Sequence, residues 1–307
     1  RPPGRSTPMS TAAPRTAAAA RRHVTAFFYR RRRVKLVLLL TPPLGWLGVI
    51  YLGALAALLF ASLWTIDPLS FTIVHSYSLG NFRTLWDNSV YRTVTVRTVG
   101  MAAAVTVTDA ALAFPLAYFM VRVAGRRLRA ALFVGVLMPL WSSYLIKAYT
   151  WKLIVAVDGP LNWGLGKLGL PHLALAFTNT SLWITLSYIW LPYMVLPVFA
   201  ALERISTSYL EASGDLGARA GQTFRRVILP LALPGIAAGS IFTFSLTLGD
   251  YIAVTLLTKS QFIGNLIYVN AGVAGNLPLA AAISTIPVVV MIVYLSVIRR
   301  TGAFEAL

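Results

Sequence analysis

Carboxylates and hydroxyls inside apolar stretches are the side chains of this sequence best placed to do chemistry. Ser240, Thr243, Thr247 and Asp250 follow one another at steps of three, four and three residues, so a helix would place all four on one face. Ionised side chains are costly inside a membrane and are candidates for function there. A hydroxyl stripe that ends in a carboxylate would suit the passage of an ammonium-bearing solute.

Structural roles compete with this interpretation. The three hydroxyls could instead form hydrogen bonds between helices, beside a close-packing patch formed by Gly235 and Gly239, and we favour that role for them. For Asp250 we favour a function. Asp109 lies near the middle of another apolar stretch. It could contact a cation or accept hydrogen bonds from a neighbouring helix, and the sequence leaves these two roles even.

Aromatic rings recur at helical spacing and could bind the same class of solute. Trp190 and Tyr193 lie deep within an apolar stretch, and a ring face attracts an alkylammonium group by about 0.5–2 kcal/mol. Trp151 and Trp183 lie nearer the ends of such stretches, a position typical of aromatic belts at membrane interfaces. Lys147 argues mildly against a cation path, although its long stem could carry the ammonium group to the outer surface.

The sequence patterns of hydrolytic and metal chemistry are absent. The chain has no Cys, no G-x-S-x-G and no H-E-x-x-H, and its three His residues are far apart. Gly166 and Lys167 resemble part of a phosphate loop, but the first Gly and the final Ser or Thr of that motif are missing. We therefore predict that the chain is not an enzyme, does not hydrolyse ATP itself and binds no metal.

The composition shows which elements must position these side chains. Charged residues make up only 12% of the 307 residues and hydrophobic residues 57%, whereas a soluble domain carries about 25% charged residues. A membrane-spanning helix needs about 20 apolar residues. Six stretches meet that length, at 36–64, 94–121, 130–156, 181–202, 231–257 and 279–298.

The net charge of +18 follows the topology of a membrane protein. Most of the Lys and Arg residues fall before the first span, in alternate loops and in the C-terminal tail, which predicts that both termini are cytoplasmic. The positive charge then orients the protein in the membrane and attracts it to anionic lipid headgroups. We therefore expect no nucleic-acid partner. We predict a disordered basic tail at 1–33, in which Met9 could be the true start, a transmembrane domain at 34–300 and a short tail at 301–307.

The longest loop between predicted spans, 203–230, indicates two short amphipathic helices separated by a turn. Gly217 can adopt a positive φ at that turn, and Pro230 can open the next membrane helix. Such a hairpin could dock a partner or lie on the membrane surface, and the pattern alone leaves the two even.

The same loop carries a family resemblance. Glu211-Ala212-Ser213, Gly217 and Val227-Ile228-Leu229-Pro230 resemble the EAA-x(3)-G-x(9)-I-x-L-P signature of permease subunits of bacterial ABC importers. Ser213 and Val227 depart mildly from it. The resemblance implies an all-α membrane protein of six transmembrane helices, with a cytoplasmic coupling-helix hairpin, 211–226, between the fourth and fifth. It marks Glu211, Ala212, Ser213, Gly217 and Pro230 as residues of the ATPase-coupling loop.

Other stretches are similar to the spermidine/putrescine branch of this family, among them 114–119, 139–143, 245–251, 265–267 and 276–282. Thr258 and Lys259 depart from a Gly pair often found there. The resemblance implies polyamine import across a bacterial inner membrane. The candidate pathway residues are then Asp250, Asp109, Trp190, Tyr193, Thr243, Thr247 and Tyr251. Related branches carry ferric iron, sulfate, molybdate or opines, and a secondary carrier or a membrane-embedded enzyme is the rival class.

The resemblance also implies partners. These are a second permease subunit, ABC ATPase subunits that hold ATP and magnesium, and an extracytoplasmic solute-binding protein. We expect this chain itself to bind no cofactor.

Overall fold

The computed structural model describes residues 32–67, 69–70 and 72–300. Nearly all of the predicted tail 1–33, and all of the tail 301–307, lie outside the described residues. The chain divides into two compact units, Arg1–Leu58 and Leu59–Leu307.

The first predicted span forms a long helical run in three parts: α2 (Arg32–Leu47), the π-helical turn η1 (Gly48–Leu52) and α3 (Gly53–Ala61). Pro42 and Pro43 lie inside α2 and do not end it, although neither has an N–H group to donate to the helix. The Thr41 hydroxyl donates to the Val37 carbonyl at 2.7 Å, one turn earlier.

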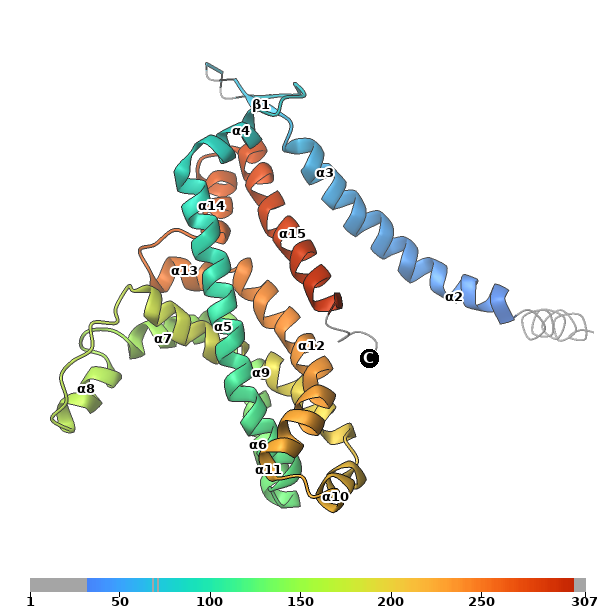
Figure 1. Cartoon of the computed structure of the whole chain (residues 1–307). Coiled ribbons are helices and arrows are strands. Elements are labelled where there is room, and N and C mark those ends of the chain that lie inside the picture. Colours follow the sequence, from blue (N-terminus) through green and yellow to red (C-terminus); the bar gives the residue numbers. More distant parts are fainter. Residues whose placement is uncertain (1–31, 68, 71, 301–307) are drawn as a thin grey trace, which may run out of the picture. The chain divides into compact units, whose positions relative to one another are not determined.

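Three long helices form the centre of the second unit and cross one another in Figure 1. They are α5 (Ser89–Arg122), α9 (Asn179–Arg204) and α12 (Leu229–Leu248). Small residues allow the close approach of α12 to α9. A Cβ atom at Gly235 would lie 2.6 Å from the Pro197 carbonyl oxygen, and one at Gly239 would lie 2.6 Å from Met194 Sδ. The predicted close-packing patch is therefore part of the α9–α12 interface.

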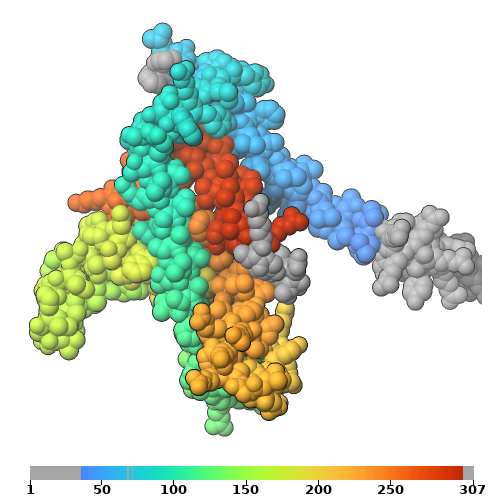
Figure 2. All heavy atoms as spheres, in the orientation of Figure 1, coloured from blue at the N-terminus to red at the C-terminus, as the bar shows by residue number. Residues whose placement is uncertain are grey.

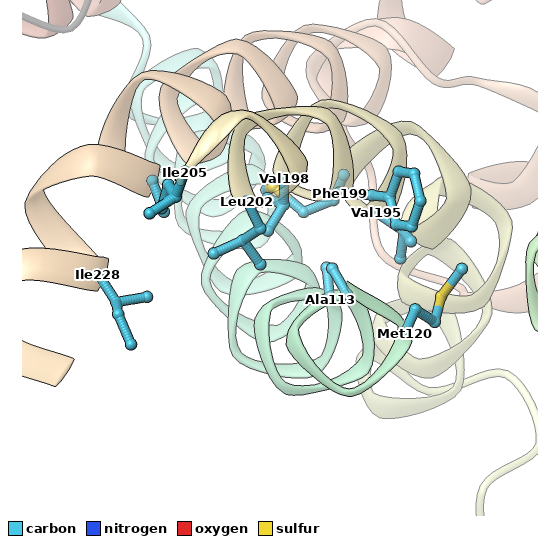
Figure 3. Close-up of a cluster of buried hydrophobic side chains, with 11 residues drawn as sticks. Ala113, Met120, Val195, Val198, Phe199, Leu202, Ile205 and Ile228 are labelled. Carbon is cyan, nitrogen blue, oxygen red and sulfur yellow. The ribbon is translucent and has the colours of Figure 1, made fainter. Parts of the chain in front are cut away.

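An apolar cluster fills one end of this three-helix centre (Figure 3). Its members are Ala113, Ala117 and Met120 of α5, Met194, Val195, Val198, Phe199 and Leu202 of α9, and Ile205, Ile228 and Ala232. Ile205 and Ile228 flank the segment between α9 and α12, so the cluster fixes both ends of the loop that the sequence singled out.

The third predicted span, 130–156, is wrong as a single helix. It consists of α6 (Arg126–Trp141) and α7 (Tyr144–Ile154), which are bent by 98° at the residues between them. Ser142 has an extended backbone there, and the Lys147 ammonium group donates to the Pro139 carbonyl across the break at 3.0 Å. Lys147 thus satisfies a carbonyl at the end of α6. From the sequence, we expected its ammonium group to extend to the outer surface instead.

The fifth predicted span, 231–257, is wrong at its end. Helix α12 stops at Leu248, and α13 (Ile252–Leu257) begins after a short break. A Cβ atom at Gly264 would lie 2.4 Å from the Asp250 carbonyl oxygen, so the next helix packs directly against the backbone of the break. Tertiary packing interrupts a run that is apolar enough to continue.

The described residues contain five helices long and apolar enough to span a membrane, or six if the α6–α7 pair counts as one broken span. The remaining elements are β1 (Thr65–Ile66), β2 (Ile73–Val74), α4 (Gly80–Asp87), α8 (Pro160–Lys167), α10 (Thr207–Asp215), α11 (Ala220–Thr223), η2 (Phe224–Ile228), α14 (Ile263–Tyr268), η3 (Val269–Val273) and α15 (Leu277–Arg300). The strands β1 and β2 pair antiparallel, Thr65 opposite Val74. The predicted all-α membrane fold is confirmed, with this two-residue hairpin as a minor addition.

Candidate functional site

Asp250 lies in the break between α12 and α13, and both of its carboxylate oxygens are occupied. Oδ1 accepts the backbone N–H of Ala253 at 3.0 Å, which satisfies one of the free donors in the first turn of α13. Oδ2 accepts the hydroxyl of Tyr144, the first residue of α7. Asp250 is 8% exposed, so it is a buried carboxylate with two neutral hydrogen-bond donors.

Aromatic rings adjoin this carboxylate. The Tyr144 ring stacks on Trp190 of α9 with centroids 5.5 Å apart and planes at 12°. Trp190 in turn meets Tyr193 edge to face at 5.8 Å. The indole N–H of Trp190 is buried and has no hydrogen-bond partner. We call Tyr144, Trp190, Tyr193 and Asp250 the aromatic–carboxylate cluster.

Tyr144 was not among the site residues expected from the sequence. A continuous third span would place it on a face with Trp141 and Trp151, which is typical of an interfacial belt. The 98° bend instead brings the start of α7 to Asp250, 106 residues away in sequence. The only signal that could have found it is the Ser142-Ser143 pair after Pro139, a sequence favourable to a break.

The hydroxyls of α12 make the contacts of a packed helix. Thr243 donates to the Thr106 hydroxyl of α5 at 3.4 Å, and Ser240 donates to the Ala237 carbonyl of its own helix at 2.7 Å. Thr247 is buried and its hydroxyl has no partner. Because α12 ends at Leu248, Asp250 does not continue the helical face of these hydroxyls, which was the arrangement expected from the spacing.

Two further candidates make contacts outside the cluster. Tyr251 is 40% exposed and stacks on Tyr268 with centroids 4.9 Å apart. Asp109 of α5 is fully buried, and neither of its carboxyl oxygens has a hydrogen-bond partner. The Ser187 hydroxyl of α9 interacts with this carboxyl, but outside hydrogen-bonding geometry. The structure therefore brings Asp250, Trp190 and Tyr193 together and leaves Asp109 in helix packing.

The segment between α9 and α12 has the predicted two-helix form. Helix α10 and helix α11 are joined by a turn in which Gly217 has a φ of 76°, a conformation that glycine adopts without a Cβ penalty. The Ser213 hydroxyl pairs with that of Thr223 at 2.9 Å and holds the two helices together. This contact gives Ser213, a departure from the signature, a structural role. Pro230 lies at the start of α12.

The outer face of this segment is open. Glu211 and Ala212 are exposed, and the apolar side chain of Leu216 is 89% exposed. Figure 2 shows the segment, in yellow to orange, on the surface of the second unit. Exposed apolar side chains rimmed by charged ones are typical of a surface that a partner covers.

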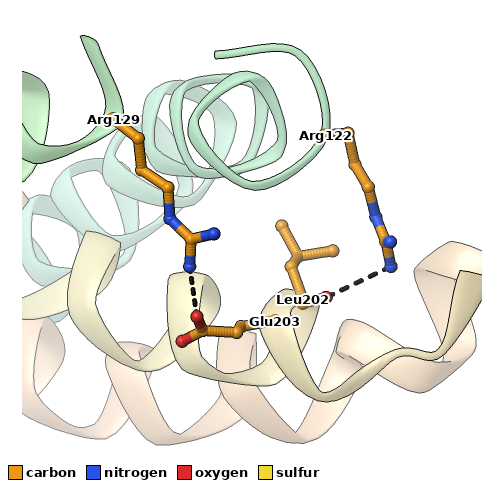
Figure 4. Close-up of polar contacts among 4 residues, drawn as sticks. All are labelled: Arg122, Arg129, Leu202 and Glu203. Atoms are coloured by element: carbon orange, nitrogen blue, oxygen red, sulfur yellow. Dashed lines mark hydrogen bonds and ion pairs between the residues drawn. The ribbon is translucent and has the colours of Figure 1, made fainter. Parts of the chain in front are cut away.

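Arginines hold the end of α9, which leads into this segment, to α5 and α6 (Figure 4). The Arg122 guanidinium at the end of α5 donates to the carbonyls of Leu202, at 3.3 Å, and Ile205, at 2.6 Å. Arg129 of α6 pairs with Glu203 of α9. The Arg122 contacts satisfy carbonyls at the end of α9, so a displacement of this end of α9 would be passed to α5 and α6.

Comparisons with known proteins agree with this geometry. The family model described as "Binding-protein-dependent transport system inner membrane component" matches residues 112–301. The chain is 45% identical over 286 residues to the inner membrane ABC transporter permease protein YdcU of Escherichia coli (strain K12), covering 89% of this chain and 91% of that one. It is 32% identical to the spermidine/putrescine transport system permease protein PotB of the same organism, over 84% of this chain and 94% of that one.

Among solved structures, a chain of a bacterial alginate ABC transporter, in complex with an alginate pentasaccharide-bound periplasmic protein, has a similar fold. The TM-score is 0.72 at 17% identity, covering 92% of this chain and 97% of that chain. At this identity the likeness concerns the fold alone.

Proposed function

This chain belongs to the family of binding-protein-dependent transport system inner membrane components, and from that premise we propose that it is the permease subunit that carries polyamines in an ATP-driven importer. That it is a multi-pass membrane permease of an ABC transporter follows from the family and the relatives. The direction of transport, the cargo and the residues that contact it are the proposal.

The aromatic–carboxylate cluster is the observation that carries the proposed cargo. A polyamine is a flexible chain of methylene groups with several ammonium groups. Asp250 offers a buried negative charge, and Trp190 and Tyr193 offer ring faces that attract cations by about 0.5–2 kcal/mol each. An anionic cargo such as sulfate or molybdate would be repelled by this carboxylate. The 32% identity to PotB supports the same class of cargo.

The α10–η2 segment is the proposed ATPase-coupling loop. Its exposed Glu211, Ala212 and Leu216 would enter a partner ATPase, and Gly217 sets the angle between its two helices. A second permease subunit and an extracytoplasmic solute-binding protein complete the assembly, while ATP and magnesium are held by the ATPase subunits. In this arrangement the coupling loop and both termini are cytoplasmic.

The alternative is an ABC importer permease for another solute, such as ferric iron or an opine. A secondary carrier is less favoured, because a carrier does not require an exposed loop that follows a helix end held by arginines of α5 and α6.

Uptake of radiolabelled spermidine tests the proposal. Cells would express this chain with its partner permease, ATPase and binding protein, as the natural sequence and as Asp250→Asn. We expect spermidine uptake by the natural transporter and a reduction of at least about tenfold in the variant, because the isosteric amide lacks the charge that pairs with ammonium. Copurification of the ATPase with Asp250→Asn is the control for assembly. No spermidine uptake by an intact natural complex would discard polyamines as cargo and keep the permease.

A further inference from the structure

We propose that Tyr144 is a specificity-determining residue, whose hydroxyl occupies on Asp250 the position that an ammonium group of the cargo takes during transport. This inference rests on the proposed function, because it requires that Asp250 meets a cargo with hydrogen-bond donors. To that function it adds a role for Tyr144, an exchange of hydrogen-bond donors at Asp250, and the requirement that the cargo carries such a donor.

The two carboxylate oxygens of Asp250 differ in whether their hydrogen-bond donor can be exchanged. Oδ1 accepts a backbone N–H of α13 at 3.0 Å, and losing that bond would uncap the helix. Oδ2 accepts a side-chain hydroxyl that belongs to a different helix, α7. A donor can therefore replace Tyr144 at Oδ2 while the α13 cap stays intact.

The charge of a hydrogen-bond donor determines whether it can displace the Tyr144 hydroxyl from Asp250. Tyr144 is a neutral donor to a carboxylate that is 8% exposed. The bond from Tyr144 has one ionised partner, whereas a bond from an ammonium group has two, which adds the attraction between opposite charges in a poorly solvated site and neutralises the buried charge. A solute without an N–H or O–H donor cannot take the place of the hydroxyl. The exchange thus selects protonated amines and rejects anions.

The position of Tyr144 at the start of α7 allows its hydroxyl to move away from Asp250. It is the first residue of α7 and directly follows the extended residues of the 98° break. Rotation of α7 about this break would withdraw the hydroxyl from Asp250, and α7 would then slide over α13, against which it packs. Breaks of this kind are the places where helices absorb backbone rotation.

Withdrawal of Tyr144 would also expose a second contact. The Tyr144 ring covers Trp190, with centroids 5.5 Å apart, so the ring face of Trp190 becomes free when Tyr144 moves. The buried indole N–H of Trp190 has no partner in the present conformation. A ring face beside a freed carboxylate oxygen is a binding site for an alkylammonium group.

Basal ATP hydrolysis of the complete purified transporter, without solute or binding protein, gives a test that does not depend on the cargo. Tyr144→Phe keeps the ring stack and removes only the hydroxyl, so Oδ2 loses its donor and the present conformation loses stability. We expect basal hydrolysis to rise about fivefold, the factor that corresponds to one lost hydrogen bond. Tyr149→Phe, on the same helix with its ring beside Lys152, is the matched control and should change nothing.

A double variant shows whether the effect passes through Asp250. In an Asp250→Ala background, Tyr144→Phe should have no further effect on basal hydrolysis, because the contact is already lost. Equal basal hydrolysis by Tyr144→Phe and the natural transporter, with ATPase copurification intact, would overturn the exchange. So would an equal effect of Tyr144→Phe with and without Asp250.

Spermidine uptake by the same preparations separates this inference from the proposed cargo. If Tyr144→Phe raises ATP hydrolysis but the natural transporter takes up no spermidine, the exchange of Tyr144 at Asp250 is supported. Polyamines are then discarded as cargo in favour of another solute with hydrogen-bond donors. If spermidine uptake is normal and Tyr144→Phe does not change ATP hydrolysis, the exchange of Tyr144 at Asp250 is discarded and polyamines remain the proposed cargo.

Discussion

At the scale of single residues, Asp250 and Asp109 are buried carboxylates in contrasting surroundings. Asp250 has a hydrogen-bond donor at each oxygen and aromatic rings beside it. Asp109 is fully buried between packed helices, and neither of its carboxyl oxygens accepts a hydrogen bond. A buried ionised carboxylate without donors is strongly disfavoured, so we assign the proposed contact with the cargo to Asp250 and predict that Asp109 acts in packing.

Asp109→Asn tests this distinction. The amide has the same shape and no charge, so we expect spermidine uptake within about twofold of the natural transporter and no loss of thermal stability. Asp87→Asn, at an exposed residue that pairs with Arg83, serves as the control. A reduction in uptake by Asp109→Asn as large as that by Asp250→Asn would return Asp109 to the pathway.

At the scale of elements, glycines determine how closely helices approach and where they turn. Gly235 permits contact between α12 and α9, and Gly217 makes the turn between α10 and α11 with a φ of 76°. The two breaks, after α6 and after α12, let helix ends point side chains at one another. The cluster exists only because both helices are interrupted.

Gly235→Ala should weaken the helix bundle. Its Cβ atom would lie 2.5 Å from the Ala201 Cβ atom and 2.6 Å from the Pro197 carbonyl oxygen, and overpacking of this kind destabilises by about 1–3 kcal/mol. Thermal unfolding of the purified transporter measures the effect. Gly100→Ala is the matched control, because nothing lies within 4 Å of the added atom. Equal unfolding temperatures for the two variants would contradict the close packing.

Gly217→Pro should abolish uptake while the protein still inserts in the membrane. Proline fixes φ near −65°, which is incompatible with the φ of 76° at this turn, so α10 and α11 would separate. Gly217→Asn is the matched variant, since asparagine tolerates the left-handed region, and it should keep most of the uptake. Normal uptake by Gly217→Pro would refute the assignment of the coupling loop.

At the scale of the whole molecule, the membrane spans and the proposed coupling loop set the sidedness of the transporter. With six spans, counting the broken α6–α7 pair as one, the α8 region and the α10–η2 segment lie on opposite sides of the membrane. The arginines that join the end of α9 to α5 and α6 lie next to the coupling loop, which follows α9 in the chain. Movement of an ATPase bound there would reach α5, α6 and α9 directly.

Single cysteines test the orientation without interference, because the natural chain has none. Leu168→Cys, after α8, and Leu216→Cys, in the proposed coupling loop, replace side chains that are 75% and 89% exposed. A membrane-impermeant maleimide should label position 168 in intact cells and position 216 only after permeabilisation. Labelling of position 216 in intact cells would reverse the proposed topology.

The sequence by itself determined the features that depend on local pattern. Apolar length predicts the membrane helices, and the 203–230 loop predicts the hairpin with its turn at Gly217, because hydrophobic period and glycine freedom act over a few residues. Family resemblance in the same loop predicts the permease. All of these features follow from neighbours in the chain.

Only the tertiary structure decided where the helices break and which side chains then meet. The run 231–257 is apolar enough for one helix, but Gly264 packs against the Asp250 backbone and α13 begins anew. Tyr144 and Asp250 are brought together by two such breaks. The physical reason is that these contacts join residues far apart in sequence, and their packing energy outweighs the local preference to continue a helix.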